Sequence, residues 1–186
     1  VNCAVLANKL STARELLGRL RLAYENLPKW MQQGIVTWNK GDIALENGSK
    51  ILAAATSSSA VRGSSFNIIF LDEFAHVPSN IADQFFSSVY PTISSGETTK
   101  VFIVSTPLGL NMFYKMWIDA EEDRSNYVPI DVHWSEVPGR DEKWKQETVK
   151  NTSETQFCHF MFRFLVFLYV SFFWRRTYLR ILILLF

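Results

Sequence analysis

The chain has 186 residues, of which 48% are hydrophobic and 20% charged, and its formal net charge is +1. This composition is typical of one globular domain with its own core, and it argues against a disordered chain or a small disulfide scaffold. A net charge this close to zero predicts no overall basic field, so a contact with nucleic acid would need a local patch. The two cysteines, Cys3 and Cys158, lie outside any CxxC motif, which favours a reducing compartment and predicts no zinc site.

The N-terminal part of the sequence predicts a strand followed by an amphipathic helix. Residues 1–7 are apolar and β-compatible, and no initiator Met precedes them, so we expect the chain to be a fragment. The helix should begin with Ser11 as its N-cap and should stop before the next proline. Its arginines, Arg14, Arg19 and Arg21, are interpreted as a solvated helix face, with a contact to DNA or to a partner as the alternative.

Three short β-type runs follow, at residues 35–38, 43–45 and 50–55. Turn residues separate them, and the Asn47-Gly48 pair before the third run is the strongest short signal for a hairpin. We therefore predict a small antiparallel meander at the edge of a sheet, whose last strand rejoins the main sheet.

A polar loop of small residues, 56–65, precedes the next strand and contains one positive charge, Arg62. Small residues let a backbone approach phosphates or a neighbouring subunit, and a simple flexible connector is the alternative. An arginine in such a loop can bring positive charge to a phosphoryl transition state, in cis or across a subunit interface. Arg62 is therefore a candidate catalytic residue.

The central pattern of the sequence is an apolar run, residues 68–71, that ends abruptly in Asp72 and Glu73. Such a run predicts a strand buried on both faces, and ligands bind beyond the carboxyl ends of parallel strands. The two acids have the form of a Walker B element with an added catalytic glutamate. Asp72 would hold Mg²⁺, and Glu73 would polarise the water that attacks a γ-phosphate. Two solvated acids at an ordinary strand end are the alternative.

The segment after these acids predicts a crossover to a second buried strand. His76 is interpreted as a loop histidine that packs or caps, because no His or Cys lies at ligand spacing from it. A helix capped by Ser79 or Asn80 should end before Pro91, and residues 94–97 should form a turn.

The second buried strand, residues 100–104, ends in Ser105 and Thr106. If this strand pairs in parallel with the one before Asp72, the two hydroxyls emerge at the same edge as the carboxylates. There they can sense the γ-phosphate or its attacking water, and capping of the following helix is a compatible alternative.

The remaining patterns predict a helix at residues 112–120, a strand at 127–134 and a helix that begins at Asp141. The alternation of strands and helices predicts an α/β fold with a mostly parallel sheet flanked by helices.

The last residues, 158–186, differ from the rest in composition. They are dense in Phe, Leu and Arg and contain no Gly, Pro, Asn or acidic residue. Their most apolar stretch, 164–174, is too short to span a bilayer. An interfacial membrane anchor and translation in a shifted reading frame are the two interpretations, and we favour the frame shift. We therefore divide the chain into a domain at 1–157 and a non-native tail at 158–186.

Several separate motifs in the same order carry a resemblance to a known family. They are Trp38-Asn39-Lys40-Gly41, residues 60–66, residues 68–75, Ser94-Ser95-Gly96 and residues 104–114. Together they resemble the ATPase domain of the large terminase subunit of tailed bacteriophages, in the branch that includes the T-even phages. The similarity covers nearly the whole chain up to about Phe157.

The resemblance implies a P-loop ATPase of the RecA-like type that binds ATP and Mg²⁺ and drives double-stranded viral DNA into a procapsid. It implies a homo-oligomeric ring in the host cell cytoplasm, a portal protein and a small terminase subunit as partners, and no membrane. Asp72 would be the Walker B metal ligand, Glu73 the catalytic carboxylate, and Ser105-Thr106 part of the coupling motif. Arg62 occupies the place where some members present an arginine finger to the neighbouring subunit's ATP.

The sequence departs from the family pattern in two respects that bear on activity. It has no G-x-x-x-x-G-K-[ST] phosphate loop, which the family carries just upstream of the matching region, and no nuclease domain follows. We therefore expect the chain alone to be inactive as an ATP hydrolase. A helicase-like translocase is the alternative from the same chemistry, and a non-catalytic binding or membrane-tethered module is the alternative from another class.

Overall fold

The computed structural model describes residues 1–57, 59, 61, 63–95, 99–154, 157 and 164–170. Its strands are β1 (Asn2–Ala7), β2 (Ile35–Trp38), β3 (Asp42–Leu45), β4 (Lys50–Ala55), β5 (Ile68–Asp72), β6 (Lys100–Ser105), β7 (Tyr127–Val132) and β8 (Phe164–Val170). Its α-helices are α1 (Leu10–Glu25), α2 (Ser79–Ser95), α3 (Met112–Glu121) and α4 (Glu142–Asn151). Short 3-10 helices are η1 (Lys29–Met31), η2 (Phe74–His76) and η3 (Trp134–Glu136).

All the described strands form one sheet in the order β2-β3-β4-β1-β5-β6-β8-β7. The middle of the sheet, β4-β1-β5-β6, is parallel throughout. The flanking pairs are antiparallel, and of the eight described strands only β3 and β8 run against the others. The prediction of a mostly parallel sheet is therefore confirmed, and so is the prediction that β5 and β6 are parallel neighbours.

The edge meander is also confirmed. Strands β2, β3 and β4 pair in antiparallel fashion, and β4 then pairs in parallel with β1. The turn between β2 and β3 is closed by the Asn39 side chain, whose Oδ1 accepts hydrogen bonds from the N–H groups of Gly41 and Asp42, each at 2.8 Å. The next turn uses Gly48 at φ 81°, a left-handed conformation that glycine adopts without a steric penalty.

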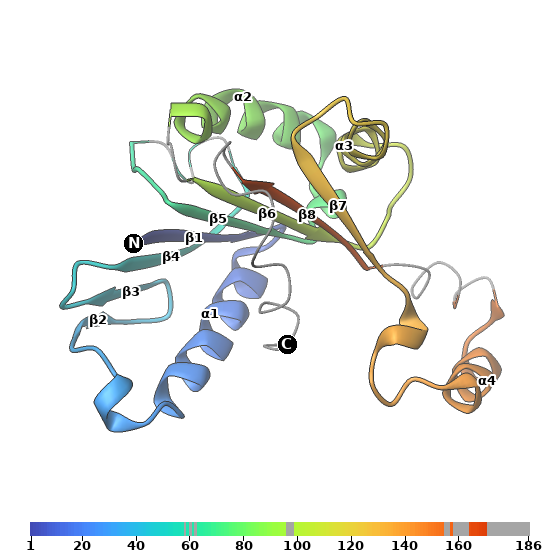
Figure 1. Cartoon of the computed structure of the whole chain (residues 1–186), viewed down its shortest axis with the longest axis horizontal. Coiled ribbons are helices and arrows are strands. Elements are labelled where there is room, and N and C mark those ends of the chain that lie inside the picture. The colour runs from blue at the N-terminus through green and yellow to red at the C-terminus, as the bar shows by residue number, and fades with distance from the viewer. Residues whose placement is uncertain are drawn as a thin grey trace.

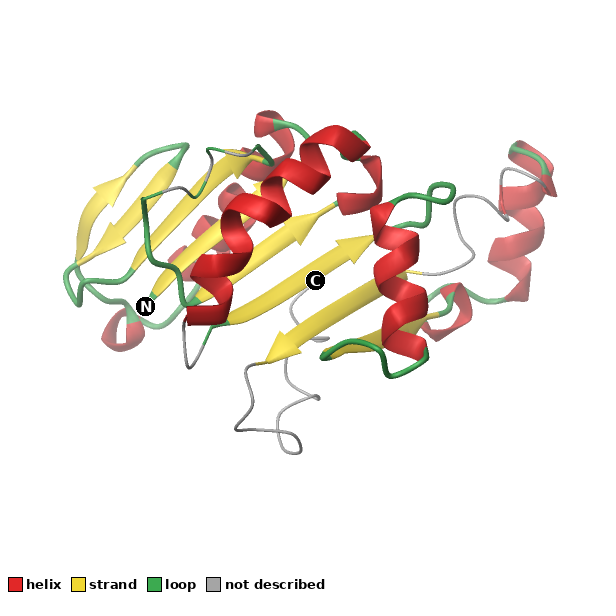
Figure 2. Cartoon of the chain, turned by 90° about the horizontal axis from the view of Figure 1, so that it is seen from above, coloured by secondary structure: helices red, strands yellow, loops and turns green. Residues whose placement is uncertain are grey.

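The helices cover the two faces of the sheet unequally (Figure 1). Helices α2 and α3 lie together on one face, where a large core forms around Phe85, Ile69 and Phe113. Of the described helices, α1 covers the other face, against β1 and β4, over a small core that includes Ala7, Ala13, Leu17, Ile43 and Ala53. Seen from above, α2 lies along the parallel middle of the sheet, and α3 lies nearer to β7 (Figure 2).

Three predicted helix ends are wrong. Helix α2 begins at Ser79, so Ser79 and Asn80 lie inside its first turn and neither is its N-cap. Helix α1 begins at Leu10, so Ser11 lies inside its first turn and the N-cap is Lys9, which makes no side-chain capping bond. Helix α2 does not stop before Pro91 but continues to Ser95. Val89 and Ile93, on either side of the proline, are both buried in the large core. The packing of that apolar face offsets the hydrogen bond that proline cannot donate.

Two further boundaries differ from the predictions. Of the predicted turn at 94–97, Ser94 and Ser95 are helical, and residues 96–97 lie outside the described residues. Strand β7 ends at Val132, and Trp134 belongs to a 3-10 turn instead of the strand. His133 caps that turn through the Ser135 N–H, which explains why the extended backbone stops there.

The tail contributes one described strand to the sheet. Strand β8 lies between β6 and β7 and pairs antiparallel with both. The division of the chain at residue 158 and the frame shift of its tail stay predictions. Among the described residues, no helix is both long and apolar enough to cross a membrane.

Candidate active site

Asp72 is the last residue of β5, at the carboxyl end of the parallel part of the sheet. It lies opposite Ala7 of β1 in the register of the two strands. Its carboxylate is partly buried, and this burial raises the pKa of Asp72 above its ordinary value, with a further rise from the neighbouring Glu73 carboxylate. A hydrogen bond from the Glu73 backbone and the positive charge of Arg19 act in the opposite direction. A cation at this carboxylate would relieve both unfavourable effects.

Glu73 follows in a left-handed backbone conformation, with φ 50° and ψ 38°. Among the described residues other than glycine, only Asp123 shares a positive φ. This conformation costs about 1–2 kcal/mol for a residue with a Cβ atom. It turns the chain sharply out of β5 into η2, so the alternation of side chains along a strand does not apply to the Asp72–Glu73 pair. The Glu73 side chain is exposed, and no ion pair holds it among the described residues.

Ser105, the last residue of β6, is buried and ties the two strands together. Its Oγ accepts a hydrogen bond from the Ala75 N–H at 3.0 Å and donates one to the Thr106 carbonyl oxygen at 2.9 Å. The hydroxyl is therefore engaged by the protein on both sides. Ser105 lies at the same edge of the sheet as Asp72 and Glu73, as expected. Its bond to Ala75 links β6 to η2, the turn that follows Glu73.

Thr106 is the more accessible of the two hydroxyl residues. Its Oγ1 shares a hydrogen bond of 3.2 Å with Nε2 of His76. His76 is thus a loop histidine that packs against the neighbouring strand end, as the sequence indicated. The partner itself, 30 residues away, could not be read from the local sequence.

Asn111 is a site residue that the sequence analysis missed. Its Nδ2 donates to the carbonyl oxygens of Ala75, at 2.7 Å, and Leu108, at 2.8 Å. Its Oδ1 accepts from the Tyr114 N–H at 3.1 Å and so caps α3. An asparagine directly before a predicted helix was the available signal for the cap. No local sequence pattern indicated the hydrogen bond from Asn111 to Ala75.

These contacts converge on η2, the turn directly after Glu73. The Ala75 N–H is held by Ser105 and the Ala75 carbonyl by Asn111. The turn that follows β5 is therefore hydrogen-bonded both to the end of β6 and to the start of α3. A displacement at Glu73 would be passed to β6 through the Ser105 bond and to α3 through the Asn111 bond, and each bond can be removed by mutation.

Arg62 lies outside the described residues. Its described neighbours show how the loop is anchored: Val61 is buried in the large core, and Gly63 has a φ of 81°. The role predicted for Arg62 stays a prediction.

The donor set at this edge suits Mg²⁺ shared with a phosphate ligand. The described residues contain no group of three or more His, Cys, Asp or Glu side chains that could hold a metal alone. Mg²⁺, however, is commonly held by one or two carboxylates together with waters and substrate phosphates. Asp72, which burial makes costly to ionise without a partner, fits the direct ligand best.

The chain is similar to known proteins in sequence and in fold. Residues 2–161 match the sequence model of the family described as terminase large subunit, T4likevirus-type, N-terminal. The fold is similar to the large terminase ATPase domain of Thermus phage P74-26, with a TM-score of 0.53 at 17% identity over 86% of this chain and 74% of that one. A mutant of the same domain gives a TM-score of 0.58 at 16% identity over 86% and 75% of the two chains.

Proposed function

The chain belongs to the family of T4-like terminase large subunits, through their N-terminal part, and we propose that it is the ATPase unit of a viral DNA-packaging motor. In the intact protein, ATP hydrolysis would drive genomic DNA into the procapsid. The observation that carries this proposal is the meeting of Asp72 and Glu73 with Ser105 at one edge of a parallel sheet. The mostly parallel α/β fold that it shares with a phage terminase ATPase domain supports it.

The two carboxylates divide the chemistry between them. Asp72 is the proposed ligand of Mg²⁺, which would neutralise charge on the phosphate oxygens when bound. Glu73 is the proposed general base: its exposed carboxylate accepts a hydrogen bond from the attacking water and orients it toward the γ-phosphate. Glu73 directly follows the last residue of β5 and its side chain is exposed, so a ligand can reach this carboxylate.

Ser105 and Thr106 are the proposed coupling residues. Thr106 is exposed enough to meet a ligand, and Ser105 is bonded to the turn behind Glu73. A change at the phosphate is thus passed from Thr106 to the β6 end, to η2 and, through Asn111, to α3. Movement of α3 relative to the sheet is the proposed mechanical output.

Further parts of the motor are proposed from family membership. These are a phosphate loop supplied by a segment outside this sequence, a homo-oligomeric ring, contacts with a portal protein and a small terminase subunit, and assembly in the host cytoplasm. Arg62 is the proposed arginine finger. Without a phosphate loop, whose backbone N–H groups cradle the phosphates, residues 1–186 alone should not turn over ATP.

The test uses a terminase chain that includes a phosphate loop, with Glu73→Gln as the variant. Loss of the general base should lower kcat by at least about 100-fold while ATP affinity is kept, because the base acts only in the transition state. Glu121→Gln, on the exposed end of α3, is the control for loss of one negative charge. Retained turnover in Glu73→Gln would remove Glu73 from the mechanism.

A further inference from the structure

The side chain of His76 forms a further link between η2 and the end of β6. Its Nε2 lies 3.2 Å from Oγ1 of Thr106. This link differs from the bond between Ala75 and Ser105, in which the backbone N–H is the donor. A histidine ring nitrogen and a threonine hydroxyl can each donate or accept, so the surroundings of the two groups decide the direction of the bond.

The backbone around His76 is held by three hydrogen bonds, which fix where the ring can lie. The His76 N–H donates to the Glu73 carbonyl oxygen at 2.9 Å. The preceding residue, Ala75, is bonded to Ser105 at 3.0 Å and to Asn111 at 2.7 Å. A ring carried by such a turn keeps its own hydrogen bond without the entropic cost of ordering the backbone.

The surroundings of the His76 ring indicate that Nε2 is the donor. The tautomer of a histidine is set by the hydrogen bond that its other ring nitrogen makes, often from Nδ1–H to a carbonyl or carboxylate oxygen. Nδ1 of His76 has no such acceptor among the described residues. The neutral ring therefore keeps its proton on Nε2, and Nε2–H donates to Thr106.

The direction of this bond decides what the Thr106 hydroxyl offers to a ligand. A hydroxyl has one hydrogen to donate and two lone pairs. The oxygens of an ionised phosphate only accept hydrogen bonds, so a threonine that binds one must donate. If Thr106 donated to His76, it would turn its lone pairs toward the phosphate. If His76 donates to Thr106, the hydroxyl hydrogen stays free for the phosphate.

We propose that His76 is a positioning residue: its Nε2–H donates to Thr106 Oγ1 and so directs the Thr106 hydroxyl hydrogen toward the γ-phosphate of ATP. The inference rests on the proposed function for the identity of the ligand. It adds a residue for which the sequence indicated only packing or capping. Because ADP lacks the γ-phosphate, the bond favours ATP over ADP. His76 acts through Thr106 and does not touch the nucleotide.

The first experiment tests the bond without ATP, in the 186-residue chain. NMR of isotope-labelled imidazole nitrogens distinguishes a protonated from an unprotonated ring nitrogen. At alkaline pH, where imidazole rings are uncharged, Nε2 of His76 should carry the proton. Thr106→Val should shift the His76 nitrogen signals, whereas Thr106→Ser, which keeps the hydroxyl, should shift them less.

His133 is the internal reference for this measurement. Its Nδ1 is hydrogen-bonded to Ser135 in its own turn, at 2.7 Å from the hydroxyl, so its signals should not respond to Thr106→Val. An unprotonated Nε2 in His76 would overturn the inference. So would His76 signals that Thr106→Val moves no more than those of His133.

The second experiment measures discrimination between nucleotides, in a terminase chain that includes a phosphate loop. The probes are ADP and a non-hydrolysable ATP analogue, each with Mg²⁺. His76→Leu should reduce the preference for the analogue by about 3–10-fold, as expected for the loss of one hydrogen bond. His76→Gln should restore most of that preference, because an amide N–H can donate to Thr106 in place of the ring. Equal losses in the two variants would contradict the donor role.

A double-mutant cycle tests whether His76 acts through Thr106. Thr106→Val alone should reduce the preference for the ATP analogue about as much as His76→Leu does. Adding His76→Leu to Thr106→Val should then cause no further loss. A full additional loss would show that His76 acts independently of Thr106, and the inference would be wrong.

This inference and the proposed function fail in different ways. The ring measurement requires no nucleotide, so an unprotonated Nε2 would leave the roles of Asp72 and Glu73 untouched. Retained turnover in Glu73→Gln would remove the proposed base without changing the state of the His76 ring. A terminase chain with a phosphate loop that binds neither nucleotide would contradict the proposed function itself.

Discussion

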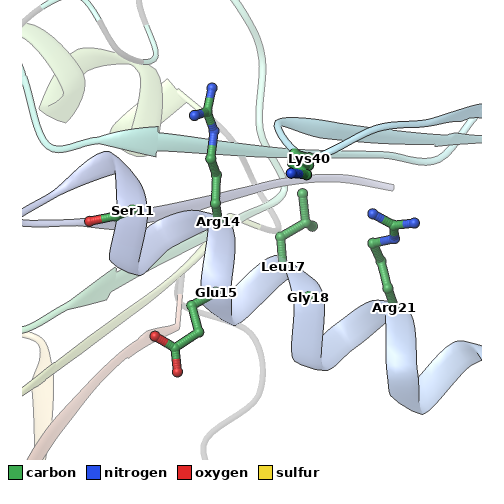
Figure 3. A pocket seen from close by; sticks show the side chains of 7 residues that line it. All are labelled: Ser11, Arg14, Glu15, Leu17, Gly18, Arg21 and Lys40. Carbon is green, nitrogen blue, oxygen red and sulfur yellow. The ribbon is translucent and has the colours of Figure 1, made fainter.

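Two regions of the molecule use their polar side chains in opposite ways. Near the carboxyl edge of β5 and β6, the side chains of Ser105 and Asn111 form hydrogen bonds with backbone groups of the protein. The second region is the α1 pocket, a shallow pocket between α1 and the turn that joins β2 to β3 (Figure 3). Around it, Arg14 and Lys40 have no ion-pair partner among the described residues. The first arrangement fixes the position of a reacting group, and the second leaves two positive charges exposed. Substitutions at the edge should therefore change stability, and substitutions in the pocket should not.

The largest stability effect is expected for Ser105→Ala. It leaves the buried Ala75 N–H without its acceptor, which should lower the free energy of unfolding by about 1–3 kcal/mol. The measurement is urea unfolding followed by circular dichroism. Ser87→Ala is the control, because its hydroxyl bonds the exposed helix carbonyl of Asp83. An effect no larger than that of the control would mean that Ser105 does not hold η2.

Asn111→Ala should have the next largest effect. It removes the cap of α3 and both bonds to carbonyl oxygens, with an expected cost of about 1–2 kcal/mol. Asn111→Asp separates the two parts, because aspartate keeps the acceptor for the Tyr114 N–H and loses the donors. If the link to Ala75 matters, Asn111→Asp should retain the helix cap and still destabilise η2, seen as faster amide hydrogen exchange there. Exchange as slow as in the unmodified chain would show that the link is dispensable.

Glu73→Gly should stabilise the fold. Glycine adopts the left-handed conformation at this position without the steric penalty, so unfolding should become harder by up to about 1 kcal/mol. Asp123→Gly is the matched control, because Asp123 has a similar φ of 55° far along the chain. Both variants should gain stability, but only Glu73→Gly should lose turnover in an active chain. A loss of stability on Glu73→Gly would show that the Glu73 side chain stabilises the site.

The smallest effect is expected for Asp72→Asn, and its size depends on pH. Burial raises the pKa of Asp72 in the folded state, so the folded protein binds this proton more tightly than the unfolded chain does. The unfavourable contribution of Asp72 is absent at low pH and develops as the pH rises through its ordinary and raised pKa values. Asp72→Asn should therefore stabilise the fold at neutral pH and make no difference well below pH 4. Urea unfolding at both pH values measures this, and a destabilised variant at neutral pH without Mg²⁺ would contradict it.

Some features of the fold and of the candidate site could be predicted from the sequence, because local sequence patterns specify them. The apolar runs before Asp72 and Ser105 predicted two buried parallel strands, and their ends fixed the edge where the site lies. The Asn47-Gly48 pair similarly predicted the turn of the meander.

Other features depend on contacts between residues far apart in the sequence. The bonds of Ala75 to Ser105 and Asn111 span 30 and 36 residues, and no periodicity reports them. Pro91 lies inside a helix because Val89 and Ile93 pack into the core, so tertiary packing outweighs a strong local signal. The α1 pocket needs Lys40 beside Arg14, which only the folded meander brings together.

The most direct test of the account measures ATP turnover and ATP affinity in the same two variants, in a terminase chain that includes a phosphate loop. The account predicts that Glu73→Gln loses turnover and keeps ATP affinity. It predicts that the control variant, Glu121→Gln, keeps both. Turnover that survives Glu73→Gln would contradict the claim that the carboxyl edge of β5 carries the chemistry.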